Sequence, residues 1–112
     1  MVLASVSANA ITAAQFEKAK AGNQAEWVLM KMYLVGLLDA FSAANLEFGA
    51  RGQPPMFCKN SGPSLNPDNL VELTEQQVKR LSLPSGSTKA DTDINIALLF
   101  ALKHEYPCKN EK

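Results

Sequence analysis

The segment from Gln24 to Phe48 most constrains how this chain can fold. Its apolar side chains recur at steps of three, four and seven residues, which is the spacing of one face of an α-helix. The members of this face are Trp27, Met30, Leu34, Leu37, Leu38 and Phe41. Further apolar residues widen the surface to most of the circumference, and these are Val28, Leu29, Met32 and Val35. Because a helix that is apolar nearly all round must be covered on more than one side, we expect residues 24–48 to form the central, heavily buried helix.

Three further segments carry helical patterns. Thr12 can cap a short helix over residues 13–21. The T-x-x-Q sequence that begins at Thr74 has the form of a capping box and predicts a helix that closes at Leu83-Pro84. Apolar residues at helical spacing predict a last helix over residues 89–105, ended by the Tyr106-Pro107 step.

Residues 49–69 form a long connection rich in Gly, Pro, Asn and Ser, whose prolines forbid a continuous helix. Loops longer than about 15 residues are usually functional or tied down, and Phe57 and Cys58 offer an apolar and a covalent anchor. No alternating strand pattern of convincing length is present. The sequence therefore predicts an all-α fold, a single domain over residues 11–112 with about four helices.

Residues 1–10 are apolar and small and end in Ala8-Asn9-Ala10, a form that signal peptidase accepts. We expect them to be the remnant of a signal peptide that is removed on export, and a frayed Ala/Ser-rich terminus is the alternative. In the oxidising compartment that export implies, Cys58 and Cys108 are expected to form a disulfide. Two buried, reduced thiols are the alternative.

Composition and charge weigh against several classes of partner. The chain has 11 Lys plus Arg and 11 Asp plus Glu, so it lacks the positive field that attracts nucleic acid or anionic lipid. The most apolar run, residues 27–41, contains Lys31 and Asp39, and we therefore expect no membrane span. His104 is the only histidine and no glycine-rich phosphate loop is present, so we expect neither a metal nor a cofactor.

The conceivable catalytic pair is Cys58 as a thiolate with His104 as its base, but no local signature surrounds either residue. His104 near a helix C-terminus is more simply an exposed residue favoured by the helix dipole. Asp91 and Asp93 are expected to open the last helix, where negative charge is stabilising. We therefore expect no catalytic residues and a protein that is not an enzyme.

Four blocks of sequence occur in a characteristic order between Met30 and Cys108. They are YLVGLLDA at residues 33–40, Phe57-Cys58, LTEQQV at residues 73–78, and residues 97–108 ending in Tyr-Pro-Cys. Together they resemble the Rap/Tai family of type VI secretion immunity proteins. Some relatives carry a further cysteine near the first block, where this chain has Met30 to Met32.

The resemblance implies a small periplasmic helical protein that binds and inhibits a peptidoglycan amidase effector and so protects the producing cell. Family members of this kind are often homodimeric, and the broad apolar surface of residues 24–48 could serve a dimer interface as well as a core. A loop held by a rigid scaffold could enter the amidase cleft, because preorganisation lowers the ordering cost of binding. The candidate loops are 59–69 and 84–91, and the candidate contact residues are Lys59, Asn60, Ser61 and Ser87, which plain turn chemistry also explains.

A general periplasmic helical binding or chaperone-like protein is the alternative function. Such a protein would bind many unfolded clients weakly, whereas an immunity protein binds one folded enzyme tightly. A 1:1 or 2:2 complex distinguishes the two.

Overall fold

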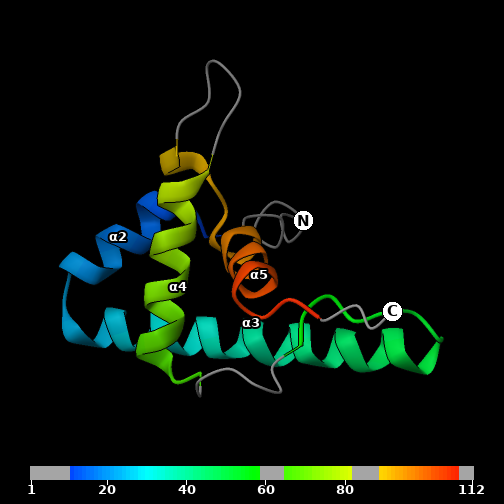
Figure 1. Ribbon diagram of the computed structural model, residues 1–112. Coiled ribbons are helices and arrows are strands. Elements are labelled where there is room, and N and C mark those ends of the chain that lie inside the picture. The colour runs from blue at the N-terminus through cyan, green and yellow to red at the C-terminus, as the bar shows by residue number, and fades with distance from the viewer. Residues whose placement is uncertain (1–10, 59–64, 82–88, 109–112) are drawn as a thin grey trace, which may run out of the picture.

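The computed structural model describes residues 11–58, 65–81 and 89–108. This part of the chain contains four α-helices and one 3₁₀ turn: α2 (Ala13–Ala21), α3 (Gln24–Ala50), α4 (Pro67–Arg80), η1 (Lys89–Asp91) and α5 (Ile94–Glu105) (Figure 1). A disulfide joins Cys58 to Cys108. The prediction of an all-α fold with about four helices and one disulfide is confirmed. The predicted signal-peptide remnant, residues 1–10, lies outside the described residues.

The core lies on one side of α3, where α2, α4 and α5 gather (Figure 1). Leu34, near the middle of α3, is fully buried, and it shares the core with Leu70 of α4 and Leu98 of α5. Phe16 of α2 packs edge-on against Trp27 of α3 with ring centroids 5.3 Å apart. Each helix thus contributes one apolar face to a shared core, which is how helices of this amphipathic kind gain most of their stability.

The start of α2 is joined to the start of α5. Thr12 caps α2 in a capping box, as the sequence predicts. The backbone N–H of Ala13 donates to the Thr92 carbonyl at 2.7 Å, and that of Ile94 donates to the Ile11 carbonyl at 2.8 Å. These two bonds hold the first described helix against the last one.

Helix α4 differs from the prediction at both ends. It begins at Pro67, where the side chain of Asn66 accepts from the backbone N–H of the third helical residue, and it ends at Arg80. A proline is favourable at the first helical position, since its missing N–H has no partner there in any case. Thr74, the predicted cap, is fully buried in mid-helix, and its hydroxyl donates to the Leu70 carbonyl at 2.8 Å. The capping-box prediction was therefore wrong.

The last helix begins at Ile94, later than predicted, because residues 89–91 form a separate 3₁₀ turn. Asp93 is its N-cap residue but makes no side-chain cap hydrogen bond. The helix ends at Glu105, directly before the Tyr106-Pro107 step, as predicted. The predicted turn at residues 85–88 lies outside the described part of the chain.

Contrary to the prediction, α3 is not heavily buried. Met30, Leu34 and Leu38 are its buried side chains, whereas Leu29 is 69% exposed and Met32 is 57% exposed. The reason is geometric, since the other three helices all cover the same side of α3. The apolar pattern locates the buried face correctly. Of the additional apolar residues, Val35 packs partly against the core, whereas Val28, Leu29 and Met32 are exposed.

The expectation of no membrane span stays a prediction, because composition alone does not decide it. By length and composition, α3 is apolar enough to cross a membrane, despite Lys31 and Asp39. The core helices of soluble proteins and signal sequences pass the same test, so it does not show that α3 spans one.

The disulfide should make a large contribution to stability. Replacing Cys58 by Ser opens a loop of about 50 residues and should lower the free energy of unfolding by about 4 kcal/mol. Cys108→Ser should give the same loss, and the double variant should lose little more, because both changes remove one bond. Chemical denaturation of the three variants measures this, and losses that add would contradict it.

Candidate functional site

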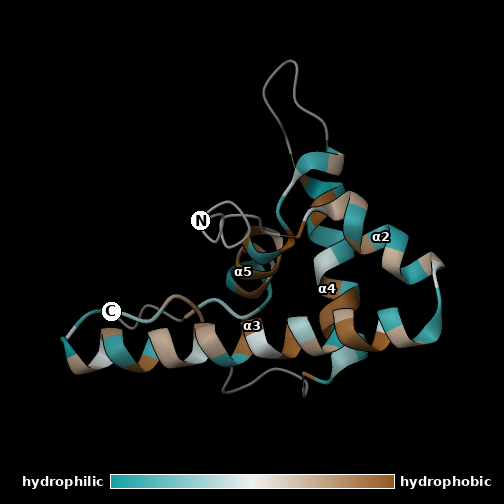
Figure 2. Cartoon of the chain, turned by 180° about the vertical axis from the view of Figure 1, so that it is seen from behind, coloured by the Kyte–Doolittle hydropathy of each residue, from teal (hydrophilic) through white to brown (hydrophobic). Residues whose placement is uncertain are grey.

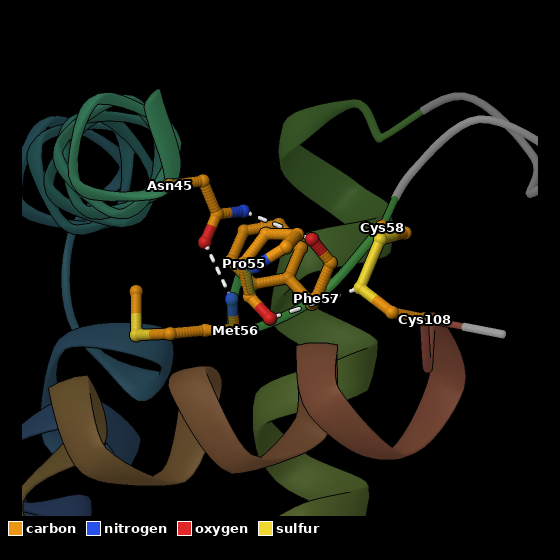
Figure 3. Close-up of a disulfide and its surroundings, with 6 residues drawn as sticks. All are labelled: Asn45, Pro55, Met56, Phe57, Cys58 and Cys108. Carbon is orange, nitrogen blue, oxygen red and sulfur yellow. Dashed lines mark hydrogen bonds between the residues drawn. A yellow bond between two sulfur atoms is a disulfide. The ribbon is translucent and has the colours of Figure 1, made fainter. Parts of the chain in front are cut away.

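Residues 53–58, which we call the strap, follow α3 and turn back along it. Gly52 makes the reversal with a φ of 73°, a conformation that residues with a Cβ rarely adopt. The side chain of Asn45 then holds the strap: its Oδ1 accepts from the Met56 N–H at 2.8 Å, and its Nδ2 donates to the Phe57 carbonyl at 2.9 Å (Figure 3). One amide side chain therefore satisfies two backbone groups of the strap.

The end of the strap is fastened to the core in three further ways. Phe57 is buried, with 1% of its surface exposed. The Cys58 N–H donates to the Tyr106 carbonyl at 2.8 Å, and the disulfide links Cys58 to Cys108 (Figure 3). Cys58 is therefore a fixed point in the structure.

The predicted contact residues Lys59, Asn60, Ser61 and Ser87 lie outside the described residues. The structure fixes Cys58, the residue that directly precedes residues 59–61 in the sequence. Of the two candidate loops, the described parts are residues 65–69, which include the start of α4, and residues 89–91, which form η1.

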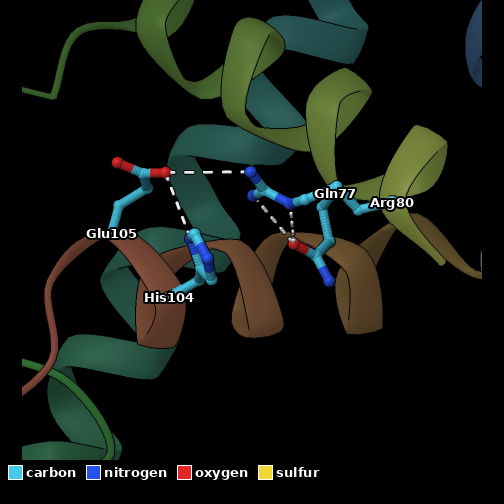
Figure 4. Close-up of polar contacts among 4 residues, drawn as sticks. All are labelled: Gln77, Arg80, His104 and Glu105. Atoms are coloured by element: carbon cyan, nitrogen blue, oxygen red, sulfur yellow. Dashed lines mark hydrogen bonds and ion pairs between the residues drawn. The ribbon is translucent and has the colours of Figure 1, made fainter.

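His104 lies in a surface cluster at the ends of α4 and α5 (Figure 4). Its Nδ1 is 3.2 Å from Oε2 of Glu105, and the same oxygen is 3.9 Å from the Arg80 guanidinium, which also donates to Gln77. Such exposed ion pairs contribute little to stability. The sulfur of Cys58 is bonded in the disulfide, so this arrangement offers His104 no thiol to deprotonate.

In the part of the chain that is described, no three His, Cys, Asp or Glu side chains gather in a way that would hold a metal ion. A pocket of about 400 Å³ between α2 and α4 has Phe16 in its wall. Lys20 and Glu75, which also line it, form an ion pair at 2.6 Å. The pocket therefore has an apolar wall, and two of its charged lining residues, Lys20 and Glu75, are paired with each other.

The largest departure from the sequence analysis is the side of α3 that points away from the core, which we call the outer face of α3. Between positions 28 and 46 its exposed residues are Val28, Leu29, Met32, Gly36, Asp39, Ala40, Ala43 and Leu46. At 3.6 residues per turn these positions fall within about a third of the helix circumference. Only one of them carries a charge. Figure 2 shows brown and tan segments along much of α3, with hydrophilic teal segments at both of its ends.

A signal for the outer face was present in the sequence. The side of the helix that carries Leu29 also carries three small residues, Gly36, Ala40 and Ala43, next to the carboxylate of Asp39. Core positions seldom collect so many small residues beside one carboxylate. A Cβ built on Gly36 meets nothing within 4 Å, so no neighbouring element packs closely against this position. The small residues therefore flatten an open surface.

An open groove of about 550 Å³ adjoins the outer face near its N-terminal end. Leu29 and Tyr33 of α3 line one side, and Ile11 and Ala19 line the other. Leu29 belongs to both the groove and the outer face. The two features therefore adjoin at Leu29, and the groove also has polar lining from Gln15, Lys18 and Glu26.

Comparisons with known proteins add no relative: the chain matches no protein-family model, no curated protein and no solved structure.

Removing the Asn45 amide should release the strap without touching the disulfide. Asn45→Ala leaves the Met56 N–H and the Phe57 carbonyl without their partner, and we expect a loss of about 2 kcal/mol in the free energy of unfolding. Asn45→Asp keeps the acceptor for the Met56 N–H. It should therefore lose less free energy of unfolding than Asn45→Ala, at a pH where both variants fold. Urea denaturation with the disulfide intact measures both, and an Asn45→Ala variant as stable as the wild type would contradict the clamp.

Stability should fall at alkaline pH. Burial, with a contribution from the charge of Glu105, raises the pKa of Tyr106 above its ordinary 10.0, so the folded state favours the neutral phenol. This contribution is fully present below the ordinary pKa and is lost as the pH rises through the raised one. Tyr106→Phe should therefore lose less stability than the wild type between pH 9 and about pH 12. The hydrogen bond from Lys20 to Glu75 raises the pKa of Lys20 and acts in the same direction, so the comparison is made in a Lys20→Met background.

Proposed function

We propose that this chain is a periplasmic immunity protein that binds and inhibits a peptidoglycan amidase effector of a type VI secretion system. The proposal begins from the sequence blocks between Met30 and Cys108 that resemble the Rap/Tai family. The observation that carries it furthest is the strap. The first block lies in α3, the helix that also carries Asn45, and the Phe-Cys and Tyr-Pro-Cys blocks supply the two disulfide partners.

The strap suits an inhibitor physically. A segment that leaves a fixed point loses less conformational freedom when it binds than one that leaves a free chain. Cys58 is such a point, because a covalent bond and a backbone hydrogen bond hold it. Residues 59–61 follow it directly and are proposed to contact the amidase.

The disulfide also supports export. Disulfides form and persist in oxidising compartments and are rare where thiols are kept reduced. A bond between the two cysteines of a 112-residue chain is therefore in keeping with a periplasmic protein.

The outer face of α3 favours the alternative, a general periplasmic binding or chaperone-like protein. Exposed apolar surface is what such a protein needs to hold unfolded clients. In a homodimer, the same surface could instead be buried against a second copy of the chain. Both possibilities involve α3, whereas the inhibitory contact proposed here involves the end of the strap.

Affinity capture distinguishes these functions. The tagged protein is incubated with a lysate of its own organism at moderate salt, and retained proteins are identified by mass spectrometry. We expect one near-stoichiometric peptidoglycan amidase that loses activity when mixed with the purified chain. Recovery of many unrelated envelope proteins, with no inhibited amidase among them, would favour the chaperone-like function.

The contact residues are tested on the same amidase. A triple change of Lys59, Asn60 and Ser61 to Ala should raise the inhibition constant at least about tenfold, as expected when interface contacts are removed. Gln76→Ala, an exposed change on α4, is the matched control. Unchanged inhibition by the triple variant would exclude residues 59–61 from the contact.

A further inference from the structure

The disulfide lies at the edge of the fold and not in its core. Cys58 and Cys108 are both partly exposed, and Pro107, directly before Cys108, is exposed. The buried core reaches Phe57 and Tyr106 but includes neither cysteine. Exposed disulfides exchange readily with thiols, whereas buried structural ones resist reduction. The folded protein therefore leaves this bond accessible to a dithiol.

The strap is held next to Cys58 by contacts that do not involve sulfur. Phe57, the residue before Cys58, is buried with 1% of its surface exposed. The Asn45 side chain binds the Met56 N–H and the Phe57 carbonyl at 2.8 and 2.9 Å (Figure 3). Opening the disulfide removes none of these contacts, so the strap keeps its place up to Phe57.

The chain is held in a similar way before Cys108. Tyr106, two residues earlier, is 6% exposed, and its N–H donates to the Leu102 carbonyl at 2.8 Å. The two cysteines thus lie beside two independently anchored residues, with their Cα atoms 4.9 Å apart. Groups held together in this way have a high effective concentration for each other. The reduced protein would therefore keep its two thiols within reach of each other.

We propose that the Cys58–Cys108 disulfide is a redox-sensitive latch that opens and closes while the helices stay packed. To open it, a thiolate of a dithiol reductant attacks one sulfur, and the other cysteine leaves as a thiolate and takes up a proton. The second thiol of the reductant then forms the reductant's own disulfide and frees the first cysteine, so two electrons pass to the protein. A disulfide oxidant closes the latch by the reverse exchange. The end of the strap is thus fastened in an oxidising compartment and released in a reducing one.

Reduction kinetics test whether the latch opens in the folded protein. The full chain is mixed with excess dithiothreitol at urea concentrations below the unfolding transition, and the released thiols are alkylated and counted by mass spectrometry. Urea lowers the free energy of unfolding linearly, so reduction of the folded protein should change by less than about twofold in rate across this range. A rate that rises with urea as steeply as the unfolding equilibrium constant would show that the bond opens only by global unfolding, and would overturn the latch.

Fluorescence tests whether the helices stay packed once the latch is open. Trp27 is the single tryptophan of the chain and packs edge-on against Phe16, so its emission reports on the contact between α2 and α3. We expect the protein held in dithiothreitol to keep the emission spectrum and the far-ultraviolet circular dichroism of the oxidised protein. A reduced chain with the emission of the urea-unfolded chain would overturn the latch.

Closing tests whether the anchors position the two thiols. The reduced chain is given oxidised glutathione, and mass spectrometry follows the conversion of the mixed disulfide into the Cys58–Cys108 bond. Asn45→Ala should close at least about threefold more slowly than the wild type, because Cys58 is less often within reach of Cys108. Asn45→Asp keeps one of the two hydrogen bonds and should lie between them. Gln76→Ala, an exposed change on α4, is the matched control and should close at the wild-type rate. Equal rates in all four proteins would overturn the positioning on which the latch rests.

The latch stands independently of the proposed function, because all three measurements use the purified chain alone. A chain that inhibits no amidase would leave the latch in place. Reduction that requires global unfolding would overturn it, whatever the chain inhibits.

Discussion

The structure depends on α3 burying one side only. Met30, Leu34 and Leu38 lie on that side and meet α2, α4 and α5, so most of the core is built against a single helix. Hydrophobic burial is the main force available to a chain of this size, and here it is concentrated on one half of the longest helix. The other half keeps its apolar residues in solvent. Covering them with a binding partner would lower the free energy, because apolar surface would leave water.

The strap is the second element that the fold must hold in place. It begins where α3 reverses at Gly52 and ends at Cys58, and it has little regular structure of its own. Asn45 supplies the hydrogen bonds that a neighbouring strand would otherwise give, and Phe57 supplies an apolar anchor. The disulfide then makes the attachment covalent. These contacts together convert a proline-containing connection into a defined part of the structure.

Periodicity in the sequence located the helices and the core-facing side of α3, because burial requires apolar residues at helical spacing. It could not tell which additional apolar residues were covered, since Leu29 and Met32 have the same hydrophobicity in a core or on an exposed surface. Thr74 was mistaken for a cap because T-x-x-Q occurs by chance inside helices, whereas Asn66-Pro67 carries the actual start signal. Asn45 had no local signature at all, since its partners Met56 and Phe57 become neighbours only once the chain reverses. The predicted contacts Lys59, Asn60, Ser61 and Ser87 remain predictions.

In the account proposed here, the fixed end of the strap positions the residues that neutralise a cell-wall amidase. Growth of cells that export the amidase recovered with this chain tests that claim most directly. Co-expression of the chain with an export signal should restore growth, and the same chain without the signal should not, because the amidase acts outside the cytoplasm. Lysis that continues at full rate in the presence of the exported, disulfide-bonded chain would contradict the account.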